Sequence, residues 1–196
     1  MQKEYVSAAD ALQKLKEGNE AYLHAKTGAG DISCEKRFET SRNGQKPYAV
    51  IVGCSDSRVI PECIFSAGIG ELFVIRVAGN VIDAHQLGSI EYAVGHLGCR
   101  LVLVLGHTGC GAVAAAAEQT EGYIKRIADE IKYAIGEERD GVRASMLNVK
   151  HSVAKIKELL PKWSDVQVTG ALYDTESGLV DFEILDRLLR TGTTQI

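Results

Sequence analysis

No uninterrupted apolar run in this sequence approaches the length of about 18 residues that a membrane-spanning helix needs. No secretory signal is expected, because residues 1–10 contain no apolar core segment of the required length. The five cysteines are odd in number and show no paired spacing, which argues against a secreted disulfide scaffold. We therefore expect a soluble, cytoplasmic protein.

Charge of one sign does not accumulate anywhere along the chain. The formal net charge is −4, and acidic residues are interspersed with basic ones. A nucleic-acid-binding or membrane-surface protein would need a basic stripe or a polybasic patch, and neither is present. We therefore expect a small-molecule substrate and no nucleic-acid or membrane partner. The 196 residues, 45% of them hydrophobic, suit one domain over residues 1–196.

Two short polar motifs stand out against this background. They are Cys54-Ser-Asp-Ser-Arg58 and His107-Thr-Gly-Cys-Gly111. Each directly follows an apolar run, residues 48–52 and 101–105, that is typical of a buried parallel strand. In open α/β sheets, ligands bind outside the carboxyl ends of the strands, so both motifs are expected at a binding crevice.

The motifs supply three candidate metal ligands, Cys54, His107 and Cys110. Two thiolates and one imidazole suit zinc, and three protein ligands leave the fourth tetrahedral position open, as in a catalytic site. We therefore predict one Zn²⁺ per chain. The alternative is that these residues are small core residues or a redox thiol. The charged pair Asp56 and Arg58 beside Cys54 favours the metal site, because such a pair is costly in a loop unless it is paired or coordinated.

Segments of strand and helix character alternate along the chain. This alternation predicts an α/β fold with a central, mainly parallel sheet flanked by helices on both faces. Residues 1–44 are expected to form a helical arm and residues 45–196 the α/β core. The expected strands are residues 48–52, 72–77, 101–105, 166–173 and 179–184. The expected helices are residues 7–25 with Ser7 as cap, a short one ending near residues 43–44, and residues 84–97, 112–118, 123–138 and 143–160.

A residue that acts on the metal-bound water is also expected. Two thiolates donate more charge to zinc than three imidazoles, so this ligand set alone activates a bound water less strongly. Asp56 is the best candidate, because Arg58 can keep it ionised while it accepts a hydrogen bond from zinc-bound hydroxide.

Six segments together give the chain a specific resemblance. They are Gln45-Lys-Pro47, the Cys54 to Arg58 motif, Phe73-Val-Ile-Arg-Val-Ala-Gly-Asn80, Gly88-Ser-Ile-Glu-Tyr-Ala-Val94, the His107 to Gly111 motif and Gly170-Ala-Leu-Tyr-Asp174. Over most of its length the chain resembles the β-class carbonic anhydrases. The resemblance implies a zinc lyase (carbonate dehydratase) that reversibly hydrates carbon dioxide to bicarbonate and a proton by attack of zinc-bound hydroxide. It also implies the Asp56–Arg58 dyad and a closed state in which Asp56 is the fourth zinc ligand.

The resemblance further implies a substrate pocket. Gln45 would be an amide donor to the substrate, with the Gly111 backbone nearby and Phe73 and Tyr92 lining the pocket, partly from a neighbouring subunit. His96 matches a position proposed as a proton shuttle. Without the resemblance, Gln45 would be a solvated loop residue and the other three side chains ordinary core or surface residues. A homodimer or tetramer is implied, in which the amino-terminal helix reaches onto a partner; packing on its own domain is the alternative.

Ile51 marks a departure within the family. The bicarbonate-regulated subgroup has a tryptophan at this position, so we expect the plant-like subtype. Two other functions stay open: a carbon disulfide or carbonyl sulfide hydrolase with the same zinc motif, and a non-enzymatic zinc-binding or redox module. The glycine-rich stretch around His107 does not match the glycine order of nucleotide-binding loops.

Overall fold

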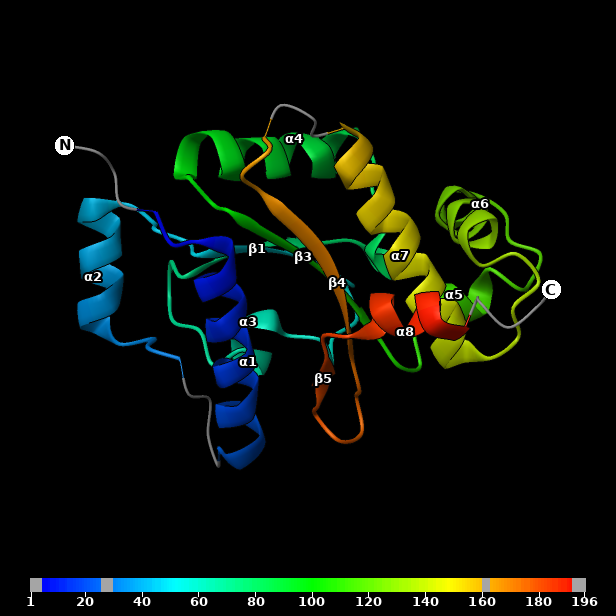
Figure 1. Cartoon of the computed structure of the whole chain (residues 1–196), viewed down its shortest axis with the longest axis horizontal. Coiled ribbons are helices and arrows are strands. Elements are labelled where there is room, and N and C mark those ends of the chain that lie inside the picture. Colours follow the sequence, from blue (N-terminus) through cyan, green and yellow to red (C-terminus); the bar gives the residue numbers. More distant parts are fainter. Residues whose placement is uncertain (1–4, 26–29, 160–162, 192–196) are drawn as a thin grey trace.

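A five-stranded sheet with the strand order β2-β1-β3-β4-β5 forms the centre of the computed structural model, which describes residues 5–25, 30–159 and 163–191 (Figure 1). Its strands are β1 (Ala49–Gly53), β2 (Leu72–Arg76), β3 (Leu101–His107), β4 (Gln167–Tyr173) and β5 (Val180–Asp181). The first four strands pair in parallel, and only β5 runs antiparallel to its neighbour. The predicted fold class, a mainly parallel sheet flanked by helices, is therefore confirmed.

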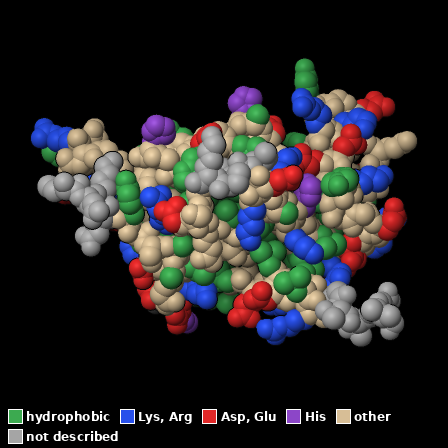
Figure 2. Space-filling model, turned by 45° about the horizontal axis from the view of Figure 1, so that its top comes forward, with side chains coloured by type: hydrophobic (Ala, Val, Ile, Leu, Met, Phe, Trp, Pro, Cys, Tyr) green, Lys and Arg blue, Asp and Glu red, His purple; other side chains and the backbone are tan. Residues whose placement is uncertain are grey.

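Helices connect the strands and cover the sheet. They are α1 (Ala8–His24), α2 (Cys34–Asn43), α3 (Pro61–Ile64), α4 (Ala84–Tyr92), α5 (Gly111–Ala115), α6 (Ile124–Ile135), α7 (Gly141–Leu159) and α8 (Ile184–Thr191), with a 3₁₀ turn η1 (Ala78–Asn80) and a π-helical turn η2 (Ala93–Leu97). No helix in the described part of the chain combines the length and the apolar character needed to cross a bilayer. Figure 2 shows acidic and basic side chains interspersed on one face of the molecule.

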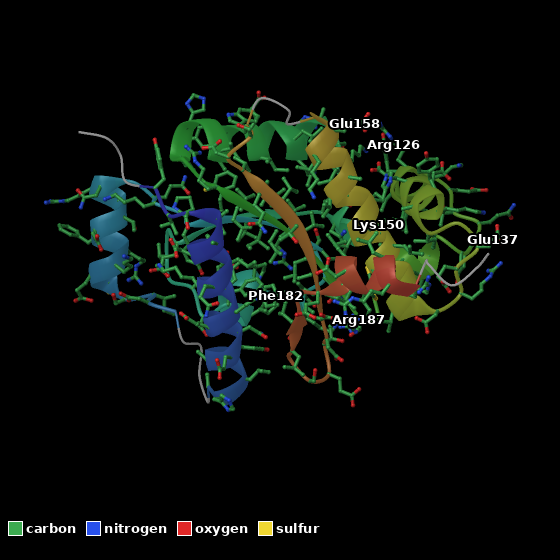
Figure 3. All side chains as sticks on the ribbon, in the orientation of Figure 1. Arg126, Glu137, Lys150, Glu158, Phe182 and Arg187 are labelled. Atoms are coloured by element: carbon green, nitrogen blue, oxygen red, sulfur yellow. The ribbon has the colours of Figure 1, made fainter. Side chains whose placement is uncertain are left out.

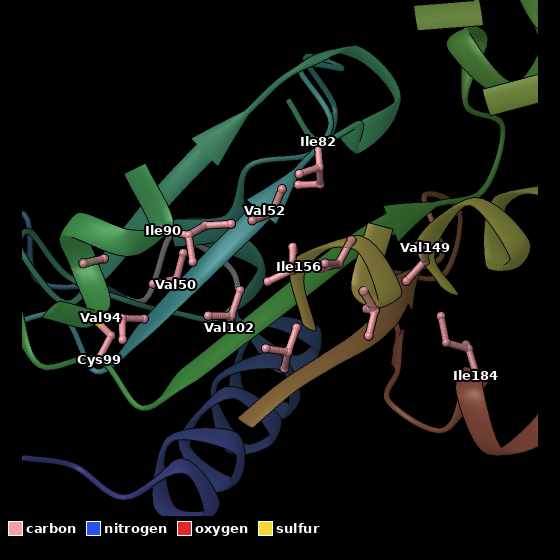
Figure 4. Packing of buried hydrophobic residues seen from close by; sticks show 14 of the residues in the cluster. Val50, Val52, Ile82, Ile90, Val94, Cys99, Val102, Val149, Ile156 and Ile184 are labelled. Atoms are coloured by element: carbon pink, nitrogen blue, oxygen red, sulfur yellow. The ribbon is translucent and has the colours of Figure 1, made fainter. Parts of the chain in front are cut away.

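The two faces of the sheet are buried by different helices. Alternate residues of a strand point to opposite faces, so Val50 and Val52 of β1 face one way and Ala49 and Ile51 the other. The first pair belongs to a core cluster with residues of α4, α7 and α8, several of which Figure 4 labels. The second pair belongs to a cluster with residues of α1 and α3. Burial on both faces explains why the central strands are continuous apolar runs.

Helix α7 packs directly against two strand residues that have no side chain. A Cβ atom on Gly106 of β3 would stand 2.5 Å from Val149 Cγ2, and one on Gly170 of β4 would stand 2.4 Å from Val149 Cγ1. Val149 therefore fills a notch between two neighbouring strands, and this contact fixes where α7 sits on the sheet.

Helix α1 is anchored to its own domain by one polar residue. Ser7 caps the helix as predicted, by accepting a hydrogen bond from the Asp10 N–H. Asn19 is buried and makes three hydrogen bonds with distant backbone: Nδ2 donates to Ile64 O (3.2 Å) and Gly178 O (3.0 Å), and Oδ1 accepts from Val180 N (3.0 Å).

The hairpin that carries β5 packs against the same helix. The ring of Phe182, which Figure 3 labels, lies 6.3 Å from the ring of Phe65. The Lys16 ammonium group of α1 lies over the Phe182 ring, 5.8 Å from its centre. Within one chain, α1 therefore packs on its own domain.

Three predicted elements differ from the structure. The strand expected over residues 179–184 is only two residues long, because Ile184 and Leu188 lie one helical turn apart and are buried as part of α8. The helix expected over residues 112–118 ends at Ala115, where tighter turns take over. The helix expected over residues 84–97 widens into η2 after Tyr92. Residue 160, the expected end of α7, lies outside the described residues.

Removing the side-chain amide of Asn19 is expected to destabilise the fold strongly. The substitution Asn19→Ala leaves three buried backbone groups without a partner, so the free energy of unfolding should fall by about 3 kcal/mol in a denaturant titration at fixed protein concentration. Gln13→Ala on the same helix is the control, because Gln13 is exposed and bonds only Glu17, and it should change the value by less than about 0.5 kcal/mol. Equal effects of the two substitutions would contradict this account of α1.

Candidate metal centre

Three potential metal ligands meet at the carboxyl edge of the sheet. Cys54 directly follows β1, His107 is the last residue of β3, and Cys110 precedes the first turn of α5. Because β1 and β3 are parallel neighbours with Gly53 paired to Leu105, their carboxyl ends coincide. The ligand atoms of Cys54, His107 and Cys110 all lie within 4.8 Å of one another, and all three side chains are buried. This group could hold a metal ion.

The imidazole of His107 is oriented by its own neighbour. Nδ1 lies 3.0 Å from the Thr108 carbonyl oxygen, which can only accept, so Nδ1 carries the proton. In the neutral imidazole Nε2 is then the unprotonated nitrogen, and it is fully buried with no hydrogen-bond partner among the described residues. Buried polar atoms are rarely left without a partner. An unpartnered Nε2 beside two thiols fits a metal ligand, whose second nitrogen is normally held in this way.

Thr108 is in turn held by the loop after β4. Its N–H donates to Tyr173 O (3.0 Å), and its hydroxyl accepts from the Thr175 N–H (3.0 Å). The carbonyl that orients His107 is therefore fixed between β3 and β4.

The contact between the thiols of Cys54 and Cys110 shifts their pKa values in opposite directions. A hydrogen bond with Cys110 lowers the pKa of Cys54 to about 4, with further help from His107 and from the Gly79 and Asp56 N–H groups. The same contact, together with burial, raises the pKa of Cys110, although the Val113 and Ala112 N–H groups oppose the rise. One thiolate therefore forms readily, and a bound cation would favour the second.

The amides at the start of α5 reach Cys110, but the helix is short. Its five residues carry much less dipole than the longer helix expected from the sequence. The individual N–H groups of Ala112 and Val113, and not the helix as a whole, stabilise a Cys110 thiolate.

Asp56 and Arg58 form a bidentate ion pair next to the ligands. Arg58 donates to Asp56 through Nε (2.9 Å to Oδ1) and Nη2 (2.7 Å to Oδ2), and Nη2 also donates to Gly109 O (3.1 Å). This pairing holds the pKa of Asp56 well below its usual range. Asp56 Oδ2 also lies 3.9 Å from His107 Nε2, so the ionised carboxylate borders the ligand group.

Arg76, at the end of β2, fixes the loop that carries these groups. Its guanidinium donates to Cys54 O (3.0 Å) and Asp56 O (2.7 Å). Sequence reasoning assigned no role to this residue. The available signal was an arginine at the carboxyl end of an apolar strand, at the edge where the two motifs meet.

The expected substrate residues lie elsewhere in the chain, apart from Gly111, which directly follows Cys110. Phe73 pairs with Val50 near the amino end of β2, and its ring lies 6.1 Å from the Tyr92 ring. The His96 ring lies 5.3 Å from that of Tyr92, so the three aromatic side chains form one group.

Gln45 lies at the same end of the sheet as this aromatic group. It is exposed and precedes β1, whereas Cys54 follows β1. The five residues of β1 alone span about 17 Å. Within one chain, Gln45, Phe73, Tyr92 and His96 are therefore not brought to the metal centre.

The sequence profile of the carbonic anhydrase family matches residues 49–180. The chain belongs to the carbonic anhydrase family. It is 43% identical over 127 residues to carbonic anhydrase 2 of Mycobacterium tuberculosis, which covers 62% of this chain and 61% of that protein. It is 40% identical, over the same shares, to a carbonic anhydrase of Mycolicibacterium smegmatis. The chain thus spans about three fifths of the length of these relatives.

Solved carbonic anhydrases of the β-class share the fold. A β-carbonic anhydrase of Aspergillus fumigatus superposes with a TM-score of 0.69 at 27% identity, over 95% of this chain and 99% of that one. A β-carbonic anhydrase of Sordaria macrospora, described as tetrameric, superposes with a TM-score of 0.64 at 25% identity, over 88% of this chain and 93% of that one. The predicted family is therefore confirmed.

Loss of one thiol should empty the metal centre. The substitution Cys110→Ser replaces a soft sulfur ligand by a hydroxyl, so we expect metal affinity to fall by at least about tenfold and metal to be lost on dialysis. Elemental analysis of the dialysed protein measures this directly. Cys63→Ser is the control, because Cys63 is exposed and outside the ligand group, and it should keep as much metal as the unsubstituted protein. Full retention by Cys110→Ser would refute the ligand assignment.

Proposed function

We propose that the protein is a zinc-dependent carbonic anhydrase that reversibly hydrates carbon dioxide to bicarbonate and a proton. The observation that carries this proposal is the buried group of Cys54, His107 and Cys110 with its unpartnered Nε2, next to an ionised Asp56. Two sulfurs and one imidazole nitrogen are a donor set that suits zinc. When bound, zinc would supply a Lewis acid that lowers the pKa of a water ligand from about 16 toward 7.

Asp56 would direct the attacking oxygen. Arg58 holds its carboxylate ionised through two hydrogen bonds, and Oδ2 borders the ligand group. An ionised carboxylate can only accept hydrogen bonds, so it can hold the proton of a water or hydroxide there and turn a lone pair toward the substrate carbon. The same carboxylate could instead occupy the fourth metal position in a closed state. The bidentate hold by Arg58 opposes that movement, and so favours the open state.

The substrate pocket would be completed by a second copy of the chain. Gln45, Phe73 and Tyr92 lie at the opposite end of the sheet from their own metal centre, so they could line only a partner's site. Helix α2 supports this arrangement, because it has no buried residue and its Phe38 is 60% exposed (Figure 1 shows it at the edge of the molecule). We propose at least a homodimer, with His96 beside Tyr92 as a proton acceptor.

We also propose a single domain and a cytoplasmic setting. One domain over residues 1–196 is supported by a single sheet that takes strands from most of the chain. A cytoplasmic setting is supported by the five free cysteines, because thiols stay reduced there. The plant-like subtype stays a prediction.

Activity can be tested by stopped-flow hydration of carbon dioxide, on protein of known zinc content. We expect hydration that rises with zinc occupancy and disappears on chelation. A protein that holds one zinc per chain and hydrolyses carbon disulfide or carbonyl sulfide, but does not hydrate carbon dioxide, would refute the proposal in favour of a sulfur-gas hydrolase.

Asp56→Asn should separate metal binding from activity. The amide keeps the size of the side chain but loses the charge that holds Arg58 and accepts the proton, so kcat/KM for hydration should fall by about 100-fold while zinc content stays unchanged. Asp83→Asn is the control, because Asp83 caps α4 far along the chain and asparagine caps equally well. An Asp56→Asn variant as active as the control would remove Asp56 from the mechanism.

Two inactive variants should restore each other if the site is shared between subunits. In a dimer of Gln45→Ala with Asp56→Asn, one site has both lesions and the other has neither. Random co-assembly should therefore recover about one quarter of the unsubstituted activity. Asp56→Asn co-assembled with Cys110→Ser is the control, since both lesions lie on the metal side and no intact site can form. A Gln45 that served its own chain would give no recovery in either mixture.

A further inference from the structure

One face of α7 is polar although it is buried. Ser145, Asn148 and Ser152 are 3%, 1% and 1% exposed, and the spacing of three and four residues places them, with Lys155, on one side of the helix. The apolar neighbours Val149 and Ile156 pack into the core below (Figure 4). Buried polar side chains are retained where they have partners, so the partners of this face are informative.

Three of these side chains hold the segment that follows β2. Asn148 Nδ2 donates to Gly79 O (2.8 Å), and Ser152 Oγ donates to Asn80 O (3.1 Å). Lys155 Nζ donates to Ile82 O and pairs with Glu130 of α6. In contrast, the Ser145 hydroxyl donates to Gly141 O within α7 itself (2.8 Å). Asn148, Ser152 and Lys155 thus bond three carbonyls of one short segment.

That segment has a conformation that needs outside support. Gly79 and Asn80 have φ values of 66° and 45°, in the left-handed region, and Asn80 is not a glycine. The other side of the turn is closely covered, because a Cβ atom on Gly79 would stand 2.6 Å from Ile131 Cδ1 and 3.1 Å from Ala112 Cβ. The turn is therefore held between α7 on one side and α5 and α6 on the other.

The turn reaches the metal centre through one hydrogen bond. The Gly79 N–H donates to Cys54 Sγ (3.2 Å), and the only other N–H on this sulfur among the described residues is that of Asp56 (3.4 Å). We propose that Asn148 and Ser152 are positioning residues that hold the Gly79 N–H against Cys54 Sγ and so limit the negative charge that this sulfur donates to a bound metal. This inference rests on the proposed metal centre.

Helix α7 would thus affect the charge on Cys54 Sγ as well as the stability of the fold. An N–H donor stabilises the electron pairs of a thiolate, so less charge passes to the metal and the metal stays a stronger Lewis acid. If the turn relaxes, the sulfur electrons rise in energy and donate more. A helix that touches neither metal nor substrate would thereby adjust the acidity of a water at the site.

The cobalt-substituted protein provides the test, because its sulfur-to-cobalt charge-transfer absorption depends on the energy of the sulfur electrons. We expect Asn148→Ala to shift this band to longer wavelength, because the sulfur electrons rise in energy. Zinc binding, measured by competition with a chromophoric chelator, should weaken by about tenfold, because the turn no longer holds Cys54 Sγ in position. Ser152→Ala should shift the band in the same direction by less. Ser145→Ala is the matched control, since it removes an equally buried hydroxyl from the same helix without touching the turn.

The possible results separate the positioning role of Asn148 and Ser152 from the existence of the metal centre. Band positions and zinc affinities of Asn148→Ala and Ser152→Ala equal to those of Ser145→Ala would overturn the positioning role, while leaving the metal centre in place. If Asn148→Ala does not fold, as judged by circular dichroism, the comparison of Ser152→Ala with Ser145→Ala decides alone. An unsubstituted protein that binds neither cobalt nor zinc would overturn the proposed metal centre and this inference with it.

Discussion

The burial of two thiols and an imidazole at one point is the constraint on which the other features of the site depend. These three groups lie where β1 and β3 end side by side, and all three side chains are buried. Buried titratable groups of this kind need partners for their protons or a cation in their place. The surrounding backbone supplies what partners there are: the Thr108 carbonyl for His107, the Gly79 and Asp56 amides for Cys54, and the first amides of α5 for Cys110. His107 Nε2 has no hydrogen-bond partner among the described residues, and it lies beside the two sulfurs, where a metal would be bound.

The two ends of the sheet hold different groups of candidate site residues. The carboxyl end holds the ligands and the Asp56–Arg58 pair, whereas the amino end holds the aromatic group of Phe73, Tyr92 and His96. A rigid sheet keeps these ends apart, so one chain cannot bring them together by a local movement. Strand β2 is an edge strand with half-buried residues, and the proposed second copy would cover such an edge.

Much of this organisation could be predicted from the sequence, because it depends on local patterns. Apolar runs predicted β1 and β3, and the motifs after them predicted the ligand group. Residue spacing cannot reveal distances between segments, so Arg76 and Asn148 were missed: each acts on backbone atoms that any residue would supply. For the same reason the two-residue β5 and the helix α8 were not distinguished from one longer strand. The apolar residues that begin this region fit either pattern until their packing partners are known.

Val149 and Asn148 are neighbours in the chain, and this adjacency couples the core to the site. The notch formed by Gly106 and Gly170 admits the Val149 side chain and sets the height of α7 above the sheet. The position of α7 in turn determines whether Asn148 Nδ2 can donate to the Gly79 carbonyl. The two glycines of the sheet therefore set the spacing between α7 and the turn whose Gly79 N–H donates to Cys54 Sγ. A bulkier residue at either glycine would lift α7 and move Asn148 away from the turn beside Cys54, without changing any of the three candidate ligands.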